Sequence, residues 1–295
     1  MGMPSRVRIA HTSTERFDRL ERRLQRLAAD LRALRRATAA DPDAAVRFAL
    51  RRRGLRWREG RTVGCLLPRG VRAQAEYHTL LRRYSFRLFL RDVIRHRQGF
   101  RLDDLVRYCS RATARTYLDW LVGHRMVAAR AGGFVLRAAV SSFGPTLEWF
   151  VATALRDELG IASAANVRLE GAAGGGDFDV IGIAPEGCIY VEVKSSPPRN
   201  IDVAQARAFL RRVDVLRPLV AIFLNDTQLR MADKIVPLLA GELAARPAPA
   251  AVQRLRGEVF ALGEGLFVAN SDPDLVGNIC ACLAHAARAR VDLEG

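Results

Sequence analysis

The sequence predicts an α/β protein whose sheet lies in the C-terminal half, and three observations lead to this prediction. Beyond residue 141, apolar residues alternate between helical and strand spacing, as in a sheet covered by helices. Before residue 141, helical spacing dominates and ends in a Gly-tipped β-ribbon. The charge divides at the same point. Residues 1–140 hold 32 Arg against 12 Asp and Glu, a net +20, whereas residues 141–295 hold 13 Arg and 2 Lys against 19 Asp and Glu, a net −4.

Composition excludes several classes of protein. An apolar fraction of 49% in 295 residues is ample for one large domain or two modest ones. No apolar run approaches the ~18 residues of a membrane span, and the first residues form no apolar signal region, so a cytoplasmic protein is expected. The five cysteines form no Cys-x-x-Cys pair, which argues against structural zinc. A basic half joined to an acidic half indicates that the first half contacts nucleic-acid phosphates. A coding preference for Arg would explain the use of Arg over Lys, but not the asymmetry.

The first region, residues 1–72, begins with one long predicted helix over residues 12–38. Thr12 and Glu15 have the spacing of a capping box. Six apolar residues then recur at alternating intervals of three and four, which is the seam of a short coiled coil: Phe17, Leu20, Leu24, Leu27, Leu31 and Leu34. The pattern favours a homodimer through this helix, with a helix packed on its own chain as the alternative. A second helix over residues 43–53 and a strand-and-loop segment over 55–72 are expected to come next.

The second region, residues 73–140, combines three predicted helices with a hairpin. The helices are expected over residues 74–97, 102–109 and 111–122, and the hairpin strands over 126–129 and 134–137. This order resembles a winged helix-turn-helix domain. The resemblance implies that helix 111–122 enters the DNA major groove and that the hairpin reaches phosphate. The residues placed to do so are Arg111, Thr113, Arg115 and Thr116 on the helix, and Arg130 and Arg137 on the hairpin. The alternative is a winged helix that only docks a protein or a neighbouring domain.

The third region, residues 141–295, starts at the break Ser141-Ser142-Phe143-Gly144-Pro145 and contains the predicted sheet. Its elements come in the order helix, three strands, helix, strand, helix, two short strands and a last helix. Their expected ranges are 146–159, 166–170, 177–184, 188–194, 201–216, 219–224, 229–245, 257–261, 265–268 and 272–290.

The hairpin over residues 177–194 carries charged residues at one end of two apolar strands. Side chains alternate along a strand, so Glu192 and Lys194 are expected on one face, and Asp177 and Asp179 likewise share a face. Carboxylates and a lysine are costly to hold there unless they bind something. Lys194 is also one of only two lysines among 47 basic residues. A surface ion-pair ladder across the hairpin is the structural alternative.

Asp179, Glu192-Val193-Lys194 and Glu148 in the preceding helix together resemble the PD-(D/E)xK nuclease superfamily, over about residues 145–226. The proline of that motif is absent, since the sequence reads Phe178-Asp179. The resemblance implies a restriction-endonuclease-like αβββαβ core. It also implies that Asp179, Glu192, the Val193 carbonyl and Glu148 hold Mg²⁺ or Mn²⁺, and that Lys194 orients water or stabilises phosphate charge. Gln205 in the next helix is the weaker match, as an active-site support.

The predicted function is therefore a Mg²⁺-dependent nuclease that hydrolyses phosphodiester bonds of DNA in repair, recombination or defence. Hydrolysis needs an activated water and stabilisation of negative charge at phosphorus, and two carboxylates with one lysine are a minimal set for that. The sequence does not separate DNA from RNA. The alternative is a non-catalytic DNA-binding regulator, or a subunit of a larger complex, that uses the nuclease fold as a scaffold. For Glu148 alone, a solvated helix residue is the alternative.

Overall fold

The computed structural model describes residues 43–58, 64–170, 177–245 and 251–294. The chain divides into two compact units, Met1–Ala44 and Ala45–Gly295, and the strands that the structure describes lie in the second. The predicted coiled coil over residues 12–38 lies outside the described residues. Among the helices that are described, none is both long enough and apolar enough to span a membrane.

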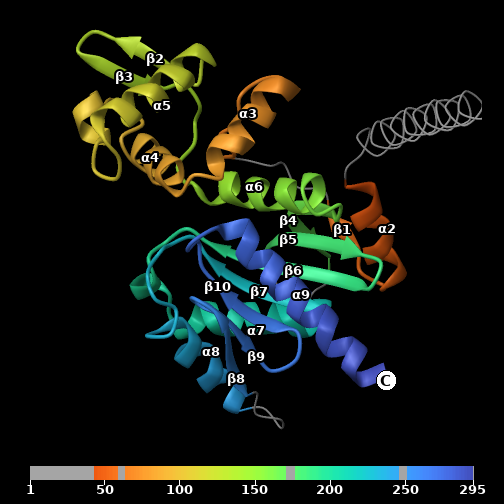
Figure 1. Cartoon of the computed structure of the whole chain (residues 1–295). Coiled ribbons are helices and arrows are strands. Elements are labelled where there is room, and N and C mark those ends of the chain that lie inside the picture. The colour runs from red at the N-terminus through yellow and green to blue at the C-terminus, as the bar shows by residue number, and fades with distance from the viewer. Residues whose placement is uncertain (1–42, 59–63, 171–176, 246–250, 295) are drawn as a thin grey trace, which may run out of the picture. The chain divides into compact units, whose positions relative to one another are not determined.

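The described part of the chain is a mixed α/β structure built on one eight-stranded sheet (Figure 1). Two strand pairs, β6–β7 and β7–β10, are parallel, and the remaining pairs are antiparallel. In spatial order the strands are β1 (Trp57–Arg58), β4 (Ala162–Leu169), β5 (Asp177–Ala184), β6 (Gly187–Lys194), β7 (Val220–Asn225), β10 (Leu266–Ala269), β9 (Val259–Leu262) and β8 (Val252–Arg256).

Helices cover both faces of this sheet. Helices α6 (Gly144–Asp157) and α9 (Leu275–Glu294) bury apolar side chains against one face. Helices α2 (Ala44–Arg52), α7 (Val203–Leu216) and α8 (Ile235–Ala244) pack on the other. Strand β6 shows the alternation: Val191 and Val193 join the first core, and Tyr190 joins the second. The order α6, β4, β5, β6, α7, β7 is the helix, three strands, helix and strand that the sequence predicts.

The region between residues 71 and 136 consists of helices and one hairpin. Its elements are α3 (Val71–Leu81), α4 (Tyr84–Arg95), the 3₁₀ helix η1 (Leu102–Leu105), α5 (Arg111–Gly123), β2 (Val127–Arg130) and β3 (Gly133–Leu136). Their buried apolar side chains belong to the same core that α6 and the sheet contribute to. The helices and hairpin therefore share a continuous core with the sheet.

The single helix predicted over residues 74–97 is two helices, so that prediction is wrong. Arg83 is extended, with φ −81° and ψ 119°, and separates α3 from α4. The side chain of Arg87 folds back to donate to the carbonyl oxygens of Leu81 and Arg82, at 2.6 and 3.2 Å. These bonds satisfy carbonyls that the end of a helix leaves without intrahelical partners. The helical spacing of apolar residues continues across the break, so the sequence pattern does not predict where α3 ends and α4 begins.

Other elements also differ from the predictions. The helix predicted over residues 102–109 is only the 3₁₀ helix η1, which ends at Leu105 before Val106, at φ −89° and ψ 10°. Strand β4 begins at Ala162 rather than 166, because pairing with β5 overrides the low strand propensity of its first, mostly alanine, residues. Helix α8 begins at Ile235 rather than 229, because the preceding segment donates the backbone N–H groups of Met231 and Ala232 to the Glu258 carboxylate, at 2.7 and 3.1 Å. The sequence pattern does not predict strand β8.

Candidate active site

Asp179 lies near the start of β5 and turns toward the backbone of β6. Its Oδ2 accepts a hydrogen bond from the Val193 N–H, 2.7 Å away. Phe178 and Ile181 pack into the same core although they are three residues apart, so simple alternation is interrupted between them. On β4, the residue between the paired Ala165 and Val167 is Asn166, which has φ 54° and lies in the left-handed region. The backbone irregularity thus coincides with the position of Asp179.

Glu192 is buried, with a side chain only 1% exposed, and both of its oxygens are engaged. Oε1 accepts from Lys194 Nζ at 2.6 Å, and Arg212 Nη1 donates to Oε1 and Oε2 at 3.1 and 3.0 Å. The Tyr190 hydroxyl also donates to Oε2. The alternative of a surface ion-pair ladder does not hold, because a carboxylate held between two cations in the interior is not a surface charge.

Two of these partners, Tyr190 and Arg212, were not predicted from the sequence. Tyr190 precedes Glu192 by two residues, so strand alternation already places both side chains on one face. Arg212 comes seven residues after Gln205, which puts the two on the same side of α7. Strand alternation was therefore a local signal for Tyr190 beside Glu192, whereas nothing in the sequence near Arg212 indicated Glu192 as its partner.

Glu148 lies on α6, and the charges of Lys194, Glu192 and Asp177 on the strands act on its carboxyl group. Burial raises its pKa from 4.5 to about 7, with Lys194 lowering it and the charges of Glu192 and Asp177 raising it. The pKa of Asp179 is also well above its usual range, first through burial and then through Glu192 and Glu148. Lys194 and the Val193 N–H act in the opposite direction. Two carboxyl groups thus lie in a region where negative charge is not fully balanced.

The donor chemistry of this region fits a hard divalent cation, because all the candidate ligands are oxygen atoms. The raised pKa values of Asp179 and Glu148 show that these two carboxyl groups lack a compensating cation, whereas Glu192 is already paired with Lys194 and Arg212. Within the described residues, no group of three or more His, Cys, Asp or Glu side chains is gathered as a metal ion would require. Because Glu192 is already paired with Lys194 and Arg212, a cation at this site would compete with them for its carboxylate.

Asp177 and Gln205 bond to residues outside this network. Asp177 is paired with Arg168 of β4, whose Nε and Nη2 lie 2.7 and 2.9 Å from its oxygens. Gln205 Oε1 accepts from the Asp202 N–H at 3.1 Å, and Asp202 Oδ1 accepts from the Gln205 N–H at 2.9 Å. This reciprocal pair caps α7. The Gln205 side chain thus has a local role that the sequence prediction did not anticipate.

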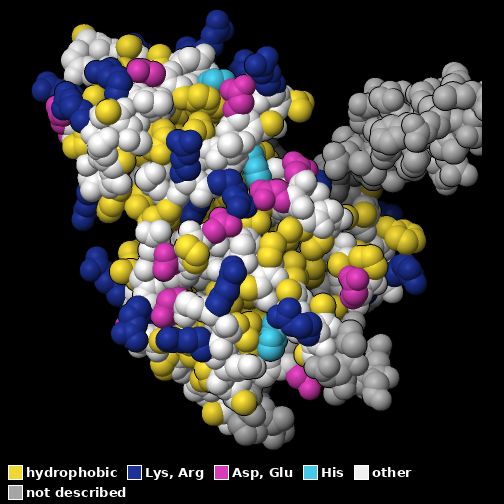
Figure 2. Space-filling view, viewed as in Figure 1, with side chains coloured by type: hydrophobic (Ala, Val, Ile, Leu, Met, Phe, Trp, Pro, Cys, Tyr) yellow, Lys and Arg dark blue, Asp and Glu magenta, His cyan; other side chains and the backbone are white. Residues whose placement is uncertain are grey.

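The residues predicted to contact DNA lie on α5 and the β2–β3 hairpin. Helix α5 begins at Arg111, where Ser110 accepts from the Thr113 N–H and caps the helix. Arg111 is ion-paired with Asp103, Arg115 lies 4.0 Å from Asp119, and the Thr116 hydroxyl donates to the Ala112 carbonyl. Arg130 and Arg137 are exposed. Residues 71–137 hold 14 Arg and no Lys against 5 Asp and Glu, and the dark blue side chains over this part in Figure 2 are therefore arginines.

Comparisons with known proteins find a weak structural likeness. No protein-family model and no curated protein matches the chain. A crystal structure of protein VC1899 from Vibrio cholerae aligns with TM-score 0.41 and 15% identity, over 69% of this chain and 51% of that one. Can2 from Sulfobacillus thermosulfidooxidans, solved in complex with cyclic tetra-adenylate, aligns with TM-score 0.41 and 14% identity, over 65% of this chain and 55% of that one. The chain spans about half the length of these two structures.

Proposed function

We propose that this protein is a Mg²⁺-dependent nuclease that hydrolyses phosphodiester bonds of DNA, with a PD-(D/E)xK site on β5 and β6. One observation carries the proposal: Asp179, Glu192 and Lys194 meet at one end of two neighbouring strands. Asp179 bonds the Val193 backbone at 2.7 Å, and Lys194 bonds Glu192 at 2.6 Å. Burial at this point favours catalysis, because charge stabilisation is strongest where water is excluded.

Asp179, Glu192, the Val193 carbonyl and Glu148 are the proposed ligands, with Mn²⁺ as an alternative ion. When bound, the ion supplies a water of lowered pKa and neutralises charge on the phosphate. Lys194 balances Glu192 in the present arrangement. If Glu192 held a cation, the Lys194 ammonium would be available to face the phosphate oxygens or to orient the attacking water.

The helices and hairpin of residues 73–140 are proposed to act as a winged helix-turn-helix domain that positions the DNA. Helix α5 begins with the exposed Arg111 and Arg115, which suits contact in the major groove. Arg130 and Arg137, on and just beyond the hairpin, suit contact with phosphate. Repair, recombination and defence are all settings in which such an enzyme acts.

Replacement of the site residues tests the nuclease proposal. We expect Asp179→Ala, Glu192→Ala and Lys194→Ala each to lower cleavage by at least about 100-fold, since each removes a group that stabilises transition-state charge. Linear, circular, nicked and branched DNA, and RNA, are incubated with Mg²⁺, Mn²⁺ or EDTA. Glu242→Gln is the control, because this carboxylate is paired with Arg207 and has no bond to Asp179, Glu192 or Lys194.

Cleavage that persists in all three alanine variants would reject the site. DNA binding without cleavage of any substrate would reject the enzyme and favour the second hypothesis, a regulator or complex subunit.

A further inference from the structure

The segment formed by α2 and β1 is the most basic described stretch that the proposed active site does not use. Residues 44–58 contain six Arg and no Asp or Glu. Val46 and Leu50 anchor α2 in the core beneath the sheet. Arg53 fixes the end of the helix by donating to the carbonyl oxygens of Leu216 and Arg217, at 2.6 and 2.8 Å. The remaining arginines are therefore presented from a rigid element.

Gly54 makes the sharp turn from α2 into β1. Its φ of 74° is one that residues with a Cβ rarely adopt. The Leu55 N–H returns to the Leu50 carbonyl at 2.9 Å and closes the helix. The turn brings α2 and β1 together around one hollow, so that residues from both elements line it.

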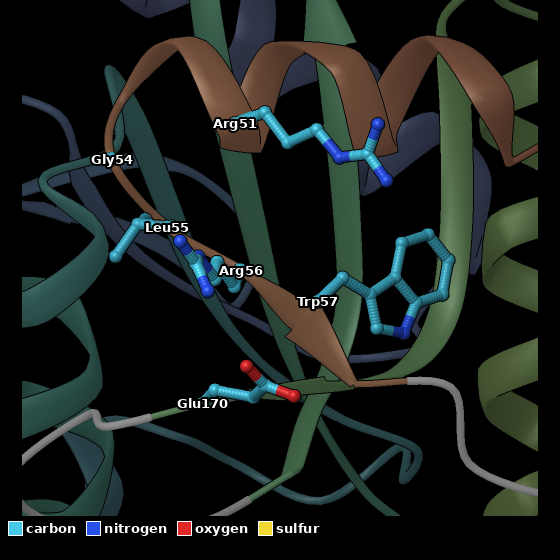
Figure 3. Close-up of a pocket in the computed structure, with 6 residues that line it drawn as sticks. All are labelled: Arg51, Gly54, Leu55, Arg56, Trp57 and Glu170. Atoms are coloured by element: carbon cyan, nitrogen blue, oxygen red, sulfur yellow. The ribbon is translucent and has the colours of Figure 1, made fainter.

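This hollow measures about 640 Å³ and is lined by Arg51, Gly54, Leu55, Arg56, Trp57 and Glu170 (Figure 3). Arg51 projects from α2 toward the indole of Trp57 on β1 (Figure 3). A second guanidinium, that of Arg47, lies 4.8 Å from the centre of the Trp57 ring. Within the described residues, the side chains of Arg51 and Arg56 make no hydrogen bond or ion pair with protein groups. Glu170 is an exposed carboxylate at the rim and offsets only part of this charge.

The hollow lies at the same end of the sheet as the proposed active site. Arg58 of β1 pairs with Arg168 of β4, and Arg168 pairs with Asp177, two residues before Asp179. The strand order β1, β4, β5, β6 leaves three strand spacings between β1 and Lys194, or roughly 14 Å at about 4.8 Å per spacing. At the duplex rise of about 3.4 Å per nucleotide this distance is at most about four nucleotides, and an extended single strand covers it with fewer.

We propose that this hollow, lined by Arg51, Gly54, Leu55, Arg56, Trp57 and Glu170, binds an unpaired strand of the DNA substrate beside the active site. Arg51 and Arg56 contact phosphates, and a base stacks on Trp57. Guanidinium groups without protein partners beside an aromatic ring are the combination that binds single strands, in which the bases are free to stack. The proposal rests on the proposed function, and it specifies that the substrate contains a single-stranded segment a few nucleotides from the cleaved bond.

The test measures binding in EDTA, so that cleavage plays no part. A fluorescein-labelled 12-mer of thymidylate is titrated with the full chain and followed by anisotropy at several salt concentrations. We expect Arg51→Gln combined with Arg56→Gln to weaken binding roughly tenfold. We also expect the slope of log affinity against log salt to fall by about 1.4, at about 0.7 per phosphate contact. Trp57→Phe should weaken binding and reduce the quenching of protein fluorescence by the oligomer, because stacking is diminished.

The control is Arg254→Gln on β8, which removes one positive charge, half the change of the double variant, at the opposite edge of the sheet. The proposal is overturned if the double variant keeps wild-type affinity and slope, or if Arg254→Gln loses as much affinity. It is also overturned if the double variant loses affinity only for a duplex. Both glutamines replace exposed residues, so misfolding is not expected to confuse the result. If the wild type binds as described but cleaves nothing, the nuclease proposal fails and the strand-binding site stands.

Discussion

At the scale of single residues, the candidate site contains carboxyl groups in two different states. Glu192 is balanced by Lys194 and Arg212, at 2.6 and 3.0 Å. Glu148 has no such balance, and its pKa is raised to about 7 by burial and by the nearby carboxylates. Ionised Glu148 therefore costs stability in the folded protein, and this cost grows as pH rises from its ordinary pKa of 4.5 through about 7.

Replacing Glu148 by Gln should therefore stabilise the metal-free protein above pH 7 and have little effect near pH 5. The reason is that the folded carboxyl group is still protonated, and hence neutral, at the lower pH. Thermal unfolding in EDTA at pH 5 and pH 8 measures this difference. Glu242→Gln, which breaks the pair with Arg207 on α7, provides the control. An equal shift in Tm at both pH values would contradict the assigned pKa.

At the scale of elements, α4 is joined to the end of β7 by a buried ion-pair cluster. Asp226 is 0% exposed and Arg87 is 1% exposed, with Arg87 Nε 2.9 Å from Asp226 Oδ1. Arg91 and the Ser271 hydroxyl also bond this carboxylate. Burial would raise the pKa of Asp226, but Arg87, Arg91 and Ser271 outweigh it and lower the pKa below its usual value. The cluster connects α4 to the sheet through buried charges, each of which would be costly to bury without its partner.

We expect Asp226→Asn to destabilise the protein by about 3–5 kcal/mol, because it leaves a buried arginine without its partner. Urea unfolding measures this loss. Asp233→Asn, at the exposed pair with Arg230, should cost less than about 1 kcal/mol.

The same cluster predicts a pH dependence with a definite sign. A carboxyl group with a lowered pKa contributes stability above its ordinary pKa of 3.8, and this contribution is lost as pH falls through the folded value. The difference between wild type and Asp226→Asn should therefore shrink below about pH 4. A difference that stays constant down to about pH 2.5 would show that Asp226 is not held ionised.

At the scale of the whole molecule, the chain consists of Met1–Ala44 and a larger unit, Ala45–Gly295. The leucine seam predicted over residues 12–38 falls in the first unit, and the candidate site falls entirely in the second. Dimerisation through the first unit therefore remains a prediction from the sequence.

Deleting residues 1–40 should convert a dimer into a monomer, because it removes the whole seam. Light scattering coupled to size exclusion measures the mass before and after the deletion. Retention of the same oligomer would reject the coiled-coil prediction. Among the residues that the structure describes, both cores begin at or after Val46, beyond the deleted segment, so the larger unit should keep its fold in either case.

The sequence by itself predicted the order of helices and strands from α6 to β7, as well as the charged end of the hairpin. Both depend on local spacing: helical and strand periodicity for the elements, and two-residue alternation for Glu192 and Lys194. The same local signal failed where helical spacing continues across a break, as between α3 and α4. It also gave no information about which distant residues meet.

Only the tertiary structure determined which residues pair with the buried carboxylates and which strands pair in the sheet. Arg212 reaches Glu192 from twenty residues away, and Arg87 reaches Asp226 across 139 residues. Strand β1, of two residues, becomes the edge of the sheet because Trp57 pairs with Leu169. Such contacts depend on the register of strands and the packing of helices, which set the position of each charge relative to the others. Composition showed that the first half of the chain is basic, but the fold alone places Arg58 of β1 at the same end of the sheet as Asp177 and Asp179.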